Sequence, residues 1–263
     1  YAYDHEWINK TIYQNAYVRT DSYFDNSPLA SSGLPSKNEL ELLNVWKDEI
    51  PAEVFTETFT PPITDGSGND RKNLLKAKEI LEKEGWFVED GKLVKDGKEF
   101  KFEFLIVSPS DEKIALAYQS NLKKLGITMD VRTVDSSQYQ ERLLSYDFDM
   151  IKRYWGVSLS PGNEQQFYWG SEVGQKDGSR NYPGINSPAV DALIEKLISA
   201  TNREELTTAI HALDRVLLWG HYVVPLYHSN KDRIAYWDFF EYPDEIPLYG
   251  IVIESWWINK DKQ

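Results

Sequence analysis

The sequence predicts an α/β fold in which helices flank a mixed, mainly parallel sheet. Between residues 101 and 155, short apolar runs alternate with helical periodicity in the order strand, helix, strand, helix, strand. Consecutive strands joined through a helix lie parallel, with a right-handed crossover. Gly126 follows the first of these helices, at a position where glycine commonly ends a helix. Hydrophobic residues make up 41% of the chain and charged residues 27%, as is usual for a globular protein.

The predicted helices follow from apolar spacing and from capping residues. Ser36 with Glu39 forms a capping box before one helix. Ser187 and Asn202 are N-cap candidates for two others. The helices are expected over residues 4–17, 37–48, 70–84, 110–125, 136–145, 188–199 and 203–219.

The predicted strands come from apolar and aromatic runs bounded by turn residues. Two Asp-Gly pairs within residues 87–100 indicate hairpin turns. The longer strands are expected over residues 101–107, 127–134, 148–155, 222–228, 232–237 and 249–258. The last of these is very apolar, and its backbone must pair with some sheet, either here or in a part of the protein beyond this chain.

Residues 156–187 form the segment with the strongest functional signal. The stretch RYWGVSLSPGNEQQFYWG (153–170) ends a core strand at Trp155 and continues as a polar, aromatic-rich loop. No regular element is expected before Pro188. Ligands of open α/β sheets bind beyond the carboxyl ends of the strands, and long ordered loops in compact domains are usually functional. We therefore expect this loop to line one wall of a ligand cleft.

Composition argues against several classes of function. The net charge of −13 makes nucleic acid an unfavourable partner, because a phosphate backbone would repel the chain. The chain has no cysteine, which excludes disulfides, thiolate zinc sites and cysteine nucleophiles. The least charged window, residues 216–229, is too short for a membrane span. The sequence shows no signal peptide and no initiator methionine, so we expect it to be part of a longer protein.

The motifs for catalysis are incomplete. The four histidines form no metal-binding pattern, so we expect no metal and no cofactor. Residues 156–160 approach a hydrolase elbow but lack its final glycine. The stretch DGSGND (65–70) is followed by lysine where a calcium loop needs glutamate. One enzyme alternative stays open, a glycosidase that uses Glu164 near Trp155 and Trp169.

Four stretches together resemble a known family. They are TIYQNAYVRTDSYFDNSPLASSGLPS (11–36), FDMIKRYWGVSLSPGNEQQFYWGS (148–171), SRNYPGINSPAVDALIEKLI (179–198) and LDRVLLWGHYVVPLYH (213–228). The family is that of the bacterial extracellular solute-binding proteins of family 5, the dipeptide and oligopeptide receptors of ABC importers. The resemblance runs along essentially the whole chain, and it points to the branch that includes the binding protein of the microcin C importer.

The resemblance implies a periplasmic receptor with two lobes, of which this chain is the C-terminal lobe with a periplasmic-binding-protein-like type II fold. Residues 1–240 would form the ligand-binding lobe, and residues 241–263 would return toward an N-terminal lobe outside this chain. The implied partners are an oligopeptide ligand, that N-terminal lobe and the ABC permease subunits in the inner membrane. The receptor would capture its ligand without catalysis or a cofactor. A carbohydrate-binding lobe on the same scaffold is the nearer alternative, because fold does not fix the ligand.

Seven residues are predicted to bind the ligand. They are Tyr139, Arg153, Trp155, Ser158, Trp169, Asn181 and Tyr182. The resemblance implies Trp155, which ends the strand, and Tyr139 in the preceding helix. It also implies the pair Asn181 and Tyr182 before the next helix. The aromatic loop adds Trp169. Arg153 is favoured over Lys152 because it shares a strand face with Trp155. Each of the two tryptophans has an alternative role as a cap on the core.

Ser158 is the position where the sequence departs from the family pattern. Many members carry an aspartate there, which pairs with the free amino terminus of the peptide. Serine supplies no negative charge. The substitution therefore favours a ligand with a blocked amino terminus, such as a formylated peptide.

Overall fold

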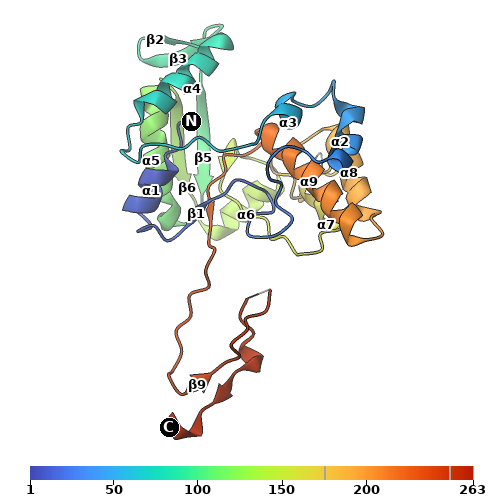
Figure 1. Ribbon diagram of the computed structural model, residues 1–263. Helices are drawn as coiled ribbons and strands as arrows, with labels where there is room; N and C mark the ends of the chain where they lie inside the picture. The colour runs from blue at the N-terminus through green and yellow to red at the C-terminus, as the bar shows by residue number, and fades with distance from the viewer. Residues whose placement is uncertain (175, 249, 263) are drawn as a thin grey trace.

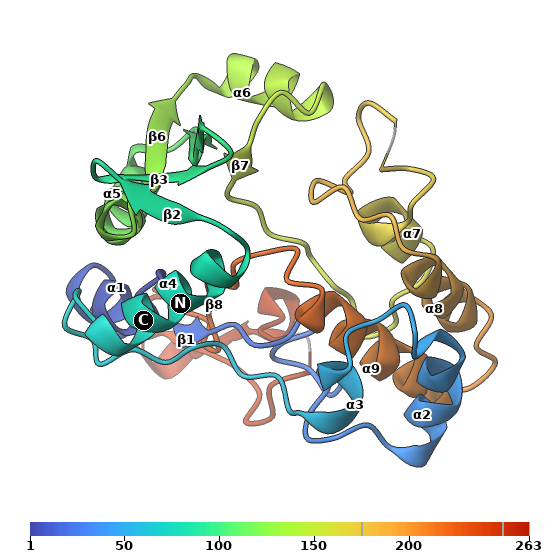
Figure 2. The ribbon, with the colours of Figure 1, turned by 90° about the horizontal axis from the view of Figure 1, so that it is seen from above.

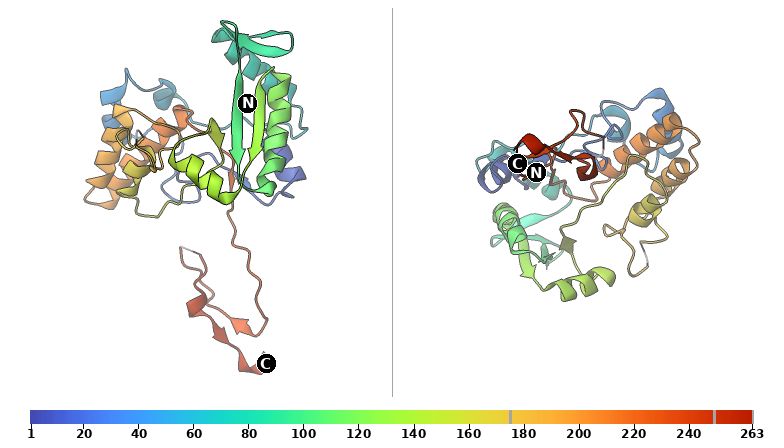
Figure 3. Two further views of the ribbon diagram at one scale, coloured as in Figure 1. Left: turned by 180° about the vertical axis from the view of Figure 1, so that it is seen from behind. Right: turned by 90° about the horizontal axis from the view of Figure 1, so that it is seen from below.

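The computed structural model describes residues 1–174, 176–248 and 250–262. The chain forms a sheet-containing part and a helical part that lie side by side, and a C-terminal extension that leaves both (Figure 1). The view from behind in Figure 3 shows the same separation of the extension from the rest. The α/β class is the one that the sequence predicts.

The sheet-containing part is built on three parallel strands in the order β6-β5-β7. Their bounds are β5 (Lys101–Ile106), β6 (Thr128–Thr133) and β7 (Met150–Ile151), and the connecting helices are α5 (Pro109–Lys124) and α6 (Ser136–Leu144). β5 pairs with β6 along its whole length, from Lys101 opposite Thr128 to Ile106 opposite Thr133. The predicted alternation of strands and helices is therefore confirmed.

Strand β7 is much shorter than the strand predicted over 148–155. Only Met150 and Ile151 pair with β5. From Lys152 the chain leaves the sheet and crosses toward the helical part (Figure 2). Apolar periodicity cannot separate a paired strand from an extended chain that is buried by other contacts, so the sequence overestimates the length of this strand.

A three-stranded antiparallel meander stands at one end of the sheet (Figure 1). Its strands are β2 (Phe87–Glu89), β3 (Lys92–Lys95) and β4 (Lys98–Glu99). Both predicted Asp-Gly turns are confirmed, because all four of their residues have positive φ angles, as a type I′ hairpin requires. The N–H of Leu93 donates to the carbonyl of Gly126 at 2.7 Å. A Cβ on Gly126 would lie 2.8 Å from the Leu93 nitrogen, so this contact requires glycine.

The helical part contains the largest hydrophobic core. Its helices are α2 (Lys37–Leu43), α3 (Glu53–Thr56), α7 (Glu164–Trp169), α8 (Pro188–Ile198) and α9 (Arg203–Trp219), with a 3-10 turn η1 (Asn44–Trp46) after α2. Helices α8 and α9 pack together and bury apolar side chains such as Leu193 and Leu213. The predicted caps Ser36, Ser187 and Asn202 each accept a hydrogen bond from a backbone N–H in the first turn of their helix.

Helix α7 lies within residues 156–187, where the sequence predicts no regular element. Its 6 residues are too few to show helical periodicity in the sequence. Within it, the Trp169 Nε1 donates to the Gln165 Oε1 at 3.0 Å, and both side chains are buried. The tertiary packing of these side chains, rather than local propensity, therefore accounts for the helix.

The remaining elements of the body are short. Helices α1 (His5–Thr11) and α4 (Arg71–Lys83) belong to the sheet-containing part, and β1 (Val18–Arg19) pairs antiparallel with β8 (Tyr227–His228). The strand predicted over 222–228 is thus reduced to its last two residues. Pro225, which has no N–H to donate to a sheet, precedes the paired residues.

The C-terminal extension departs furthest from the prediction. Residues 232–237, all of which the structure describes, form no strand. Within the stretch predicted over 249–258, β10 (Trp257–Ile258) pairs with β9 (Phe240–Glu241), and Tyr249 lies outside the described residues. Two 3-10 turns, η2 (Ile253–Ser255) and η3 (Lys260–Lys262), flank β10. Across the described residues, no helix is long and apolar enough to cross a membrane.

Candidate functional site

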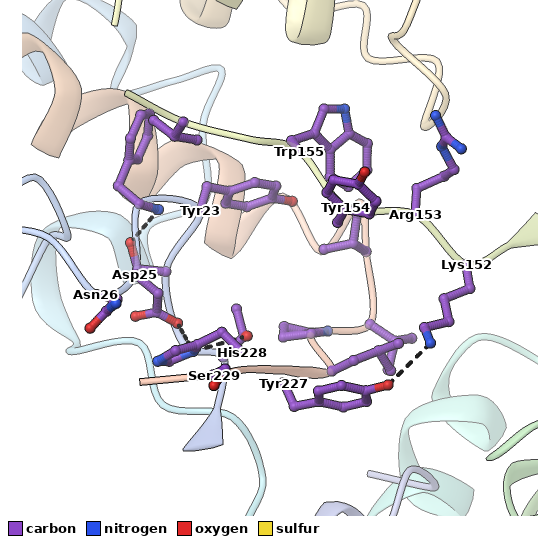
Figure 4. A pocket seen from close by; sticks show the side chains of 18 of the residues that line it. Tyr23, Asp25, Asn26, Lys152, Arg153, Tyr154, Trp155, Tyr227, His228 and Ser229 are labelled. Carbon is purple, nitrogen blue, oxygen red and sulfur yellow. Dashed lines mark hydrogen bonds and ion pairs between the residues drawn. The ribbon is translucent and has the colours of Figure 1, made fainter. Parts of the chain in front are cut away.

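A cavity of about 890 Å³ lies between the sheet-containing part and the helical part. Much of its lining comes from within residues 20–27, 148–155, 182–183 and 221–232. Figure 4 shows the side chains that surround it. The volume falls within the range of small-molecule sites, and a lining drawn from distant segments is typical of a preformed ligand pocket.

The cavity lies at the end of the sheet where a ligand is expected. Strand β7 ends at Ile151, and residues 152–155 then form one wall of the cavity. The connections that leave β5 and β6 place β6 and β7 on opposite sides of β5, which creates a topological switch point at the carboxyl ends of the strands. From the loop over 156–187, the residues that reach the cavity are Val157, Leu159, Tyr182 and Pro183.

Aromatic rings form much of this wall. The side chain of Tyr154 is 86% exposed and lines the cavity. The ring of Trp155 lies 4.8 Å from that of Trp169 and 6.3 Å from that of Tyr182, measured between centroids. Because Trp169 is buried in the core, it holds Trp155 from behind. Flat aromatic faces of this kind supply a large contact area for a ligand.

Lys152 is neutralised inside the cavity. Its Nζ lies 2.5 Å from the Oδ1 of Asp111 at the start of α5. The same Nζ donates to the hydroxyl of Tyr227 at 3.1 Å and stands 5.4 Å from the centre of that ring. This lysine is therefore fixed in place by an anion and an aromatic ring.

Arg153 has fewer of its hydrogen-bond donors paired than Lys152 does. Its guanidinium lies 5.1 Å from the centre of the Tyr182 ring, and Nη2 donates to the Tyr182 hydroxyl at 3.4 Å. Among the described residues, its buried Nε has no hydrogen-bond partner. Both Arg153 and Lys152 line the cavity (Figure 4). Residues 152–155 do not form the predicted strand, but the side chains of Arg153 and Lys152 still point in opposite directions from the chain (Figure 4).

A carboxyl group faces the cavity from the loop after β1. The Oδ2 of Asp25 accepts the N–H of Asp21 at 2.8 Å and lies 3.4 Å from the Nδ1 of His228 on β8. Burial, followed by smaller effects that include the charge of Asp21, raises the pKa of Asp25 to about 7. Burial also lowers the pKa of His228. This end of the cavity is therefore able to change its charge near neutral pH.

Helix α9 holds the loop that carries Asp25. The buried carboxylate of Asp214 accepts hydrogen bonds from the hydroxyl of Ser22 at 2.8 Å and from the N–H of Tyr23 at 2.8 Å. It also accepts the N–H of Ser31 at 3.0 Å and its hydroxyl at 2.7 Å. Burial raises the pKa of Asp214, while these hydrogen bonds act in the opposite direction. A loop without regular hydrogen bonds of its own is thus fixed beside the cavity.

Comparison with known proteins identifies the family. The family model described as "Bacterial extracellular solute-binding proteins, family 5 Middle" matches residues 1–177. The chain belongs to this family. An uncharacterised protein of Sinorhizobium fredii, y4wM, is 49% identical over 98% of this chain and 39% of its own length. The probable peptide-binding protein YejA of Agrobacterium fabrum is 42% identical over 99% of this chain and 43% of its own length.

A solved structure of the family shares the fold. The oligopeptide-binding protein AppA of Bacillus subtilis, in complex with a nonapeptide, superposes with a TM-score of 0.66 and 22% identity. The match covers 98% of this chain and 46% of AppA. The predicted periplasmic-binding-protein-like fold is therefore confirmed. The chain spans about two fifths of the length of the curated relatives it matches.

The structure separates the seven predicted site residues into two groups. Those that line the cavity are Arg153, Trp155 and Tyr182. Those outside its lining are Tyr139, Ser158, Trp169 and Asn181. A ligand contact by the second group stays a prediction.

Two residues of the second group, Tyr139 and Asn181, form hydrogen bonds to the backbone. The Tyr139 hydroxyl donates to the carbonyl of Lys152 at 3.3 Å, and thus supports the wall from behind. The amide nitrogen of the fully buried Asn181 donates to the carbonyls of Gly170 and Ile185 at 3.0 and 2.8 Å. These contacts assign both side chains a structural role.

Several cavity residues are absent from the sequence prediction. They are Tyr23, Asp25, Tyr227 and His228. All four lie within stretches that carry the resemblance to family 5, which was the one available signal. No spacing rule brings residues 20–27 and 221–232 together, because the pairing of β1 with β8 creates that contact.

The groups considered for catalysis are engaged in local contacts. The Oγ of Ser158 accepts the N–H of Ser160 at 3.1 Å, and Ser158 is exposed outside the cavity lining. The Oε1 of Glu164 accepts the N–H of Gly162 at 2.9 Å. In the part of the chain that the structure describes, no group of three or more His, Asp or Glu side chains could hold a metal ion.

Proposed function

We propose that this chain is part of the substrate-binding component of an ABC importer, and that it captures oligopeptides in the cavity for delivery to a permease. The protein would act in the periplasm without catalysis or a cofactor. One observation carries the proposal: the cavity at the carboxyl end of β7 combines aromatic walls with a cation whose hydrogen-bond donors are not all used. Membership of family 5 supports the same conclusion.

A peptide suits this lining on chemical grounds. Trp155 and Tyr154 offer flat faces that accept varied side chains. Arg153 offers a guanidinium group that binds a carboxylate through paired hydrogen bonds. Lys152 already pairs with Asp111, so Arg153 is the better anchor for a ligand carboxylate. The nonapeptide bound to AppA and the name of YejA point to the same class of ligand.

We also propose that residues 1–240 form one wall of a cleft and that residues 241–263 reach a second lobe. The curated relatives are long enough to contain such a lobe, because this chain covers 39% and 43% of their lengths. Ligand captured between two lobes would draw them together, and the closed state would be the form that the permease recognises.

The first test is mass spectrometry of the small molecules that are released when the protein, purified from its own periplasm, is denatured. Peptides in the released fraction are expected. Oligosaccharides instead would point to the carbohydrate alternative, and hydrolysis of an added oligosaccharide would point to the glycosidase.

A variant tests the assigned anchor. Arg153→Met is expected to weaken peptide binding about tenfold or more, because a charge-assisted hydrogen bond is lost. The matched control is Arg132→Met, since Arg132 is an exposed arginine on β6 that does not line the cavity. Equal affinities for both variants in calorimetric titration would contradict the role of Arg153.

A further inference from the structure

We propose that Asp25 recognises a cationic group of the ligand, the ammonium of a peptide amino terminus in the first instance, and that protonation of Asp25, followed by that of His228, makes this recognition dependent on pH. The inference rests on the proposed peptide function and names a subsite within the same cavity. It runs against the expectation drawn from Ser158, because the carboxyl group comes from another loop.

The contacts of Asp25 leave its charge unmatched. Its side chain is only 14% exposed. It accepts the backbone N–H of Asp21, and its neighbour His228 is charged only when protonated. Among the described residues, no lysine or arginine lies within ion-pair distance of this carboxyl. A buried carboxylate without a permanent cation is costly, so a cationic ligand group would relieve that cost.

A second carboxylate that lines the cavity provides a contrast. Asp111 lies 2.5 Å from the Nζ of Lys152 and is therefore already paired. A ligand ammonium at Asp111 would have to displace that lysine. Of these two half-buried carboxyl groups, Asp25 is the one available to a cation.

The charges around the cavity also give the ligand a direction. Asp25 and His228 lie on one side of the cavity, and Lys152 and Arg153 lie on the other (Figure 4). A peptide with both termini free would therefore place its ammonium at Asp25 and its carboxylate toward Arg153. Opposite charges at opposite ends select orientation as well as binding.

The response to pH follows from the groups that face Asp25. Asp21 belongs to the same loop, His228 comes from β8, and the exposed Lys231 and Asp232 follow β8 along the rim of the cavity. Burial raises the pKa of Asp25 to about 7 and lowers that of His228. As pH falls below about 7, Asp25 takes up a proton, and at lower pH His228 becomes positive. Both changes weaken the attraction for a cation.

The test uses the protein in its full natural length and a mixture of short synthetic peptides without Lys, Arg or His. Each peptide is present with a free and with an acetylated amino terminus. Captured peptides are quantified by mass spectrometry at about pH 7.5 and about pH 5.5, on either side of the raised pKa. The variants are Asp25→Asn, which keeps the shape of the side chain, and Asp48→Asn, at an exposed aspartate that does not line the cavity.

At the higher pH the parent protein is expected to prefer the free peptides about tenfold, as a hydrogen bond between charged groups implies. The preference should shrink at the lower pH. It should disappear in Asp25→Asn and persist in Asp48→Asn. Capture of both peptide forms without preference, or a preference that survives in Asp25→Asn, would overturn the inference and leave the peptide function standing. Capture of neither form would contradict the peptide function, and the inference with it.

Discussion

Two irregular segments of this chain, residues 20–36 and residues 232–262, contrast in what surrounds them. The first lies against α9, where Asp214 accepts four hydrogen bonds from Ser22, Tyr23 and Ser31. The second leaves the body of the molecule (Figure 1). Its exposed side chains include Trp237 at 72%, Leu248 at 80% and Ile253 at 69%.

The contrast teaches that buried polar partners, not regular secondary structure, fix an irregular segment. Backbone N–H groups need acceptors wherever they are buried, and a single carboxylate can supply several. The guanidinium of Arg215 also fixes residues 20–36, because it donates to the carbonyls of Gly33 and Ser32 at 2.7 and 2.8 Å. Among the described residues of 232–262, no buried carboxylate provides such support, and exposed apolar side chains such as Trp237 and Leu248 agree with the proposed contact with a second lobe.

The largest expected effect on stability comes from removing the carboxylate of Asp214. In Asp214→Ala, the hydroxyls of Ser22 and Ser31 and the N–H of Tyr23 lose their buried partner. The free energy of unfolding should fall by about 3 kcal/mol. Chemical denaturation measures it. The control is Asp238→Ala in the second segment, where an exposed side chain should change stability by less than about 0.5 kcal/mol. Similar losses in both variants would remove the distinction between the two segments.

The next effect concerns the wall of the cavity. Trp155→Ala should weaken peptide binding by about 2 kcal/mol, close to thirtyfold, because an aromatic anchor loses its contact area. Phe87→Ala, an exposed aromatic on the meander, is the matched control and should leave affinity unchanged. Calorimetric titration at a temperature where both variants are folded compares them. Unchanged binding in Trp155→Ala would show that the tryptophan serves only the core.

A smaller effect is the pH dependence of stability at Asp25. Its pKa is raised on folding, so its contribution to stability is complete below the unfolded value near 4 and is lost as pH rises through about 7. Asp25→Asn should therefore stabilise the ligand-free protein by about 1 kcal/mol at about pH 8, after allowance for solvent, and hardly at about pH 5. Thermal unfolding across this range measures the difference. An equal gain in the free energy of unfolding at both pH values would contradict the raised pKa of Asp25 as its cause.

The smallest effect is expected in the extension. Trp237→Ser should change the unfolding free energy of this chain by less than about 0.5 kcal/mol, because the side chain is already exposed. In a protein that contains the proposed second lobe, the same change should cost more than about 1 kcal/mol if the extension docks there. An equal response in both contexts would argue against that docking.

Local signals in the sequence predict much of the secondary structure. Each Asp-Gly turn of the meander is formed by two adjacent residues that both have positive φ angles. The caps at Ser36, Ser187 and Asn202 each involve only the first turn of their helix. The same holds for the alternation of strands and helices from β5 to β7. The resemblance of four stretches to family 5 added what periodicity could not, the expected class of ligand.

The tertiary structure decided which of the predicted residues meet in one place. Asp25 and His228 are far apart in the sequence and come together because β1 pairs with β8. Trp169, which looks like a loop aromatic in the sequence, is buried behind Trp155. The sequence by itself determined the capped helices, the Asp-Gly turns and the aromatic composition of the site, because turns, caps and periodicity act over a few residues. Only the folded chain decided the charge pattern of the cavity, because desolvation and pairing depend on neighbours that long-range contacts supply.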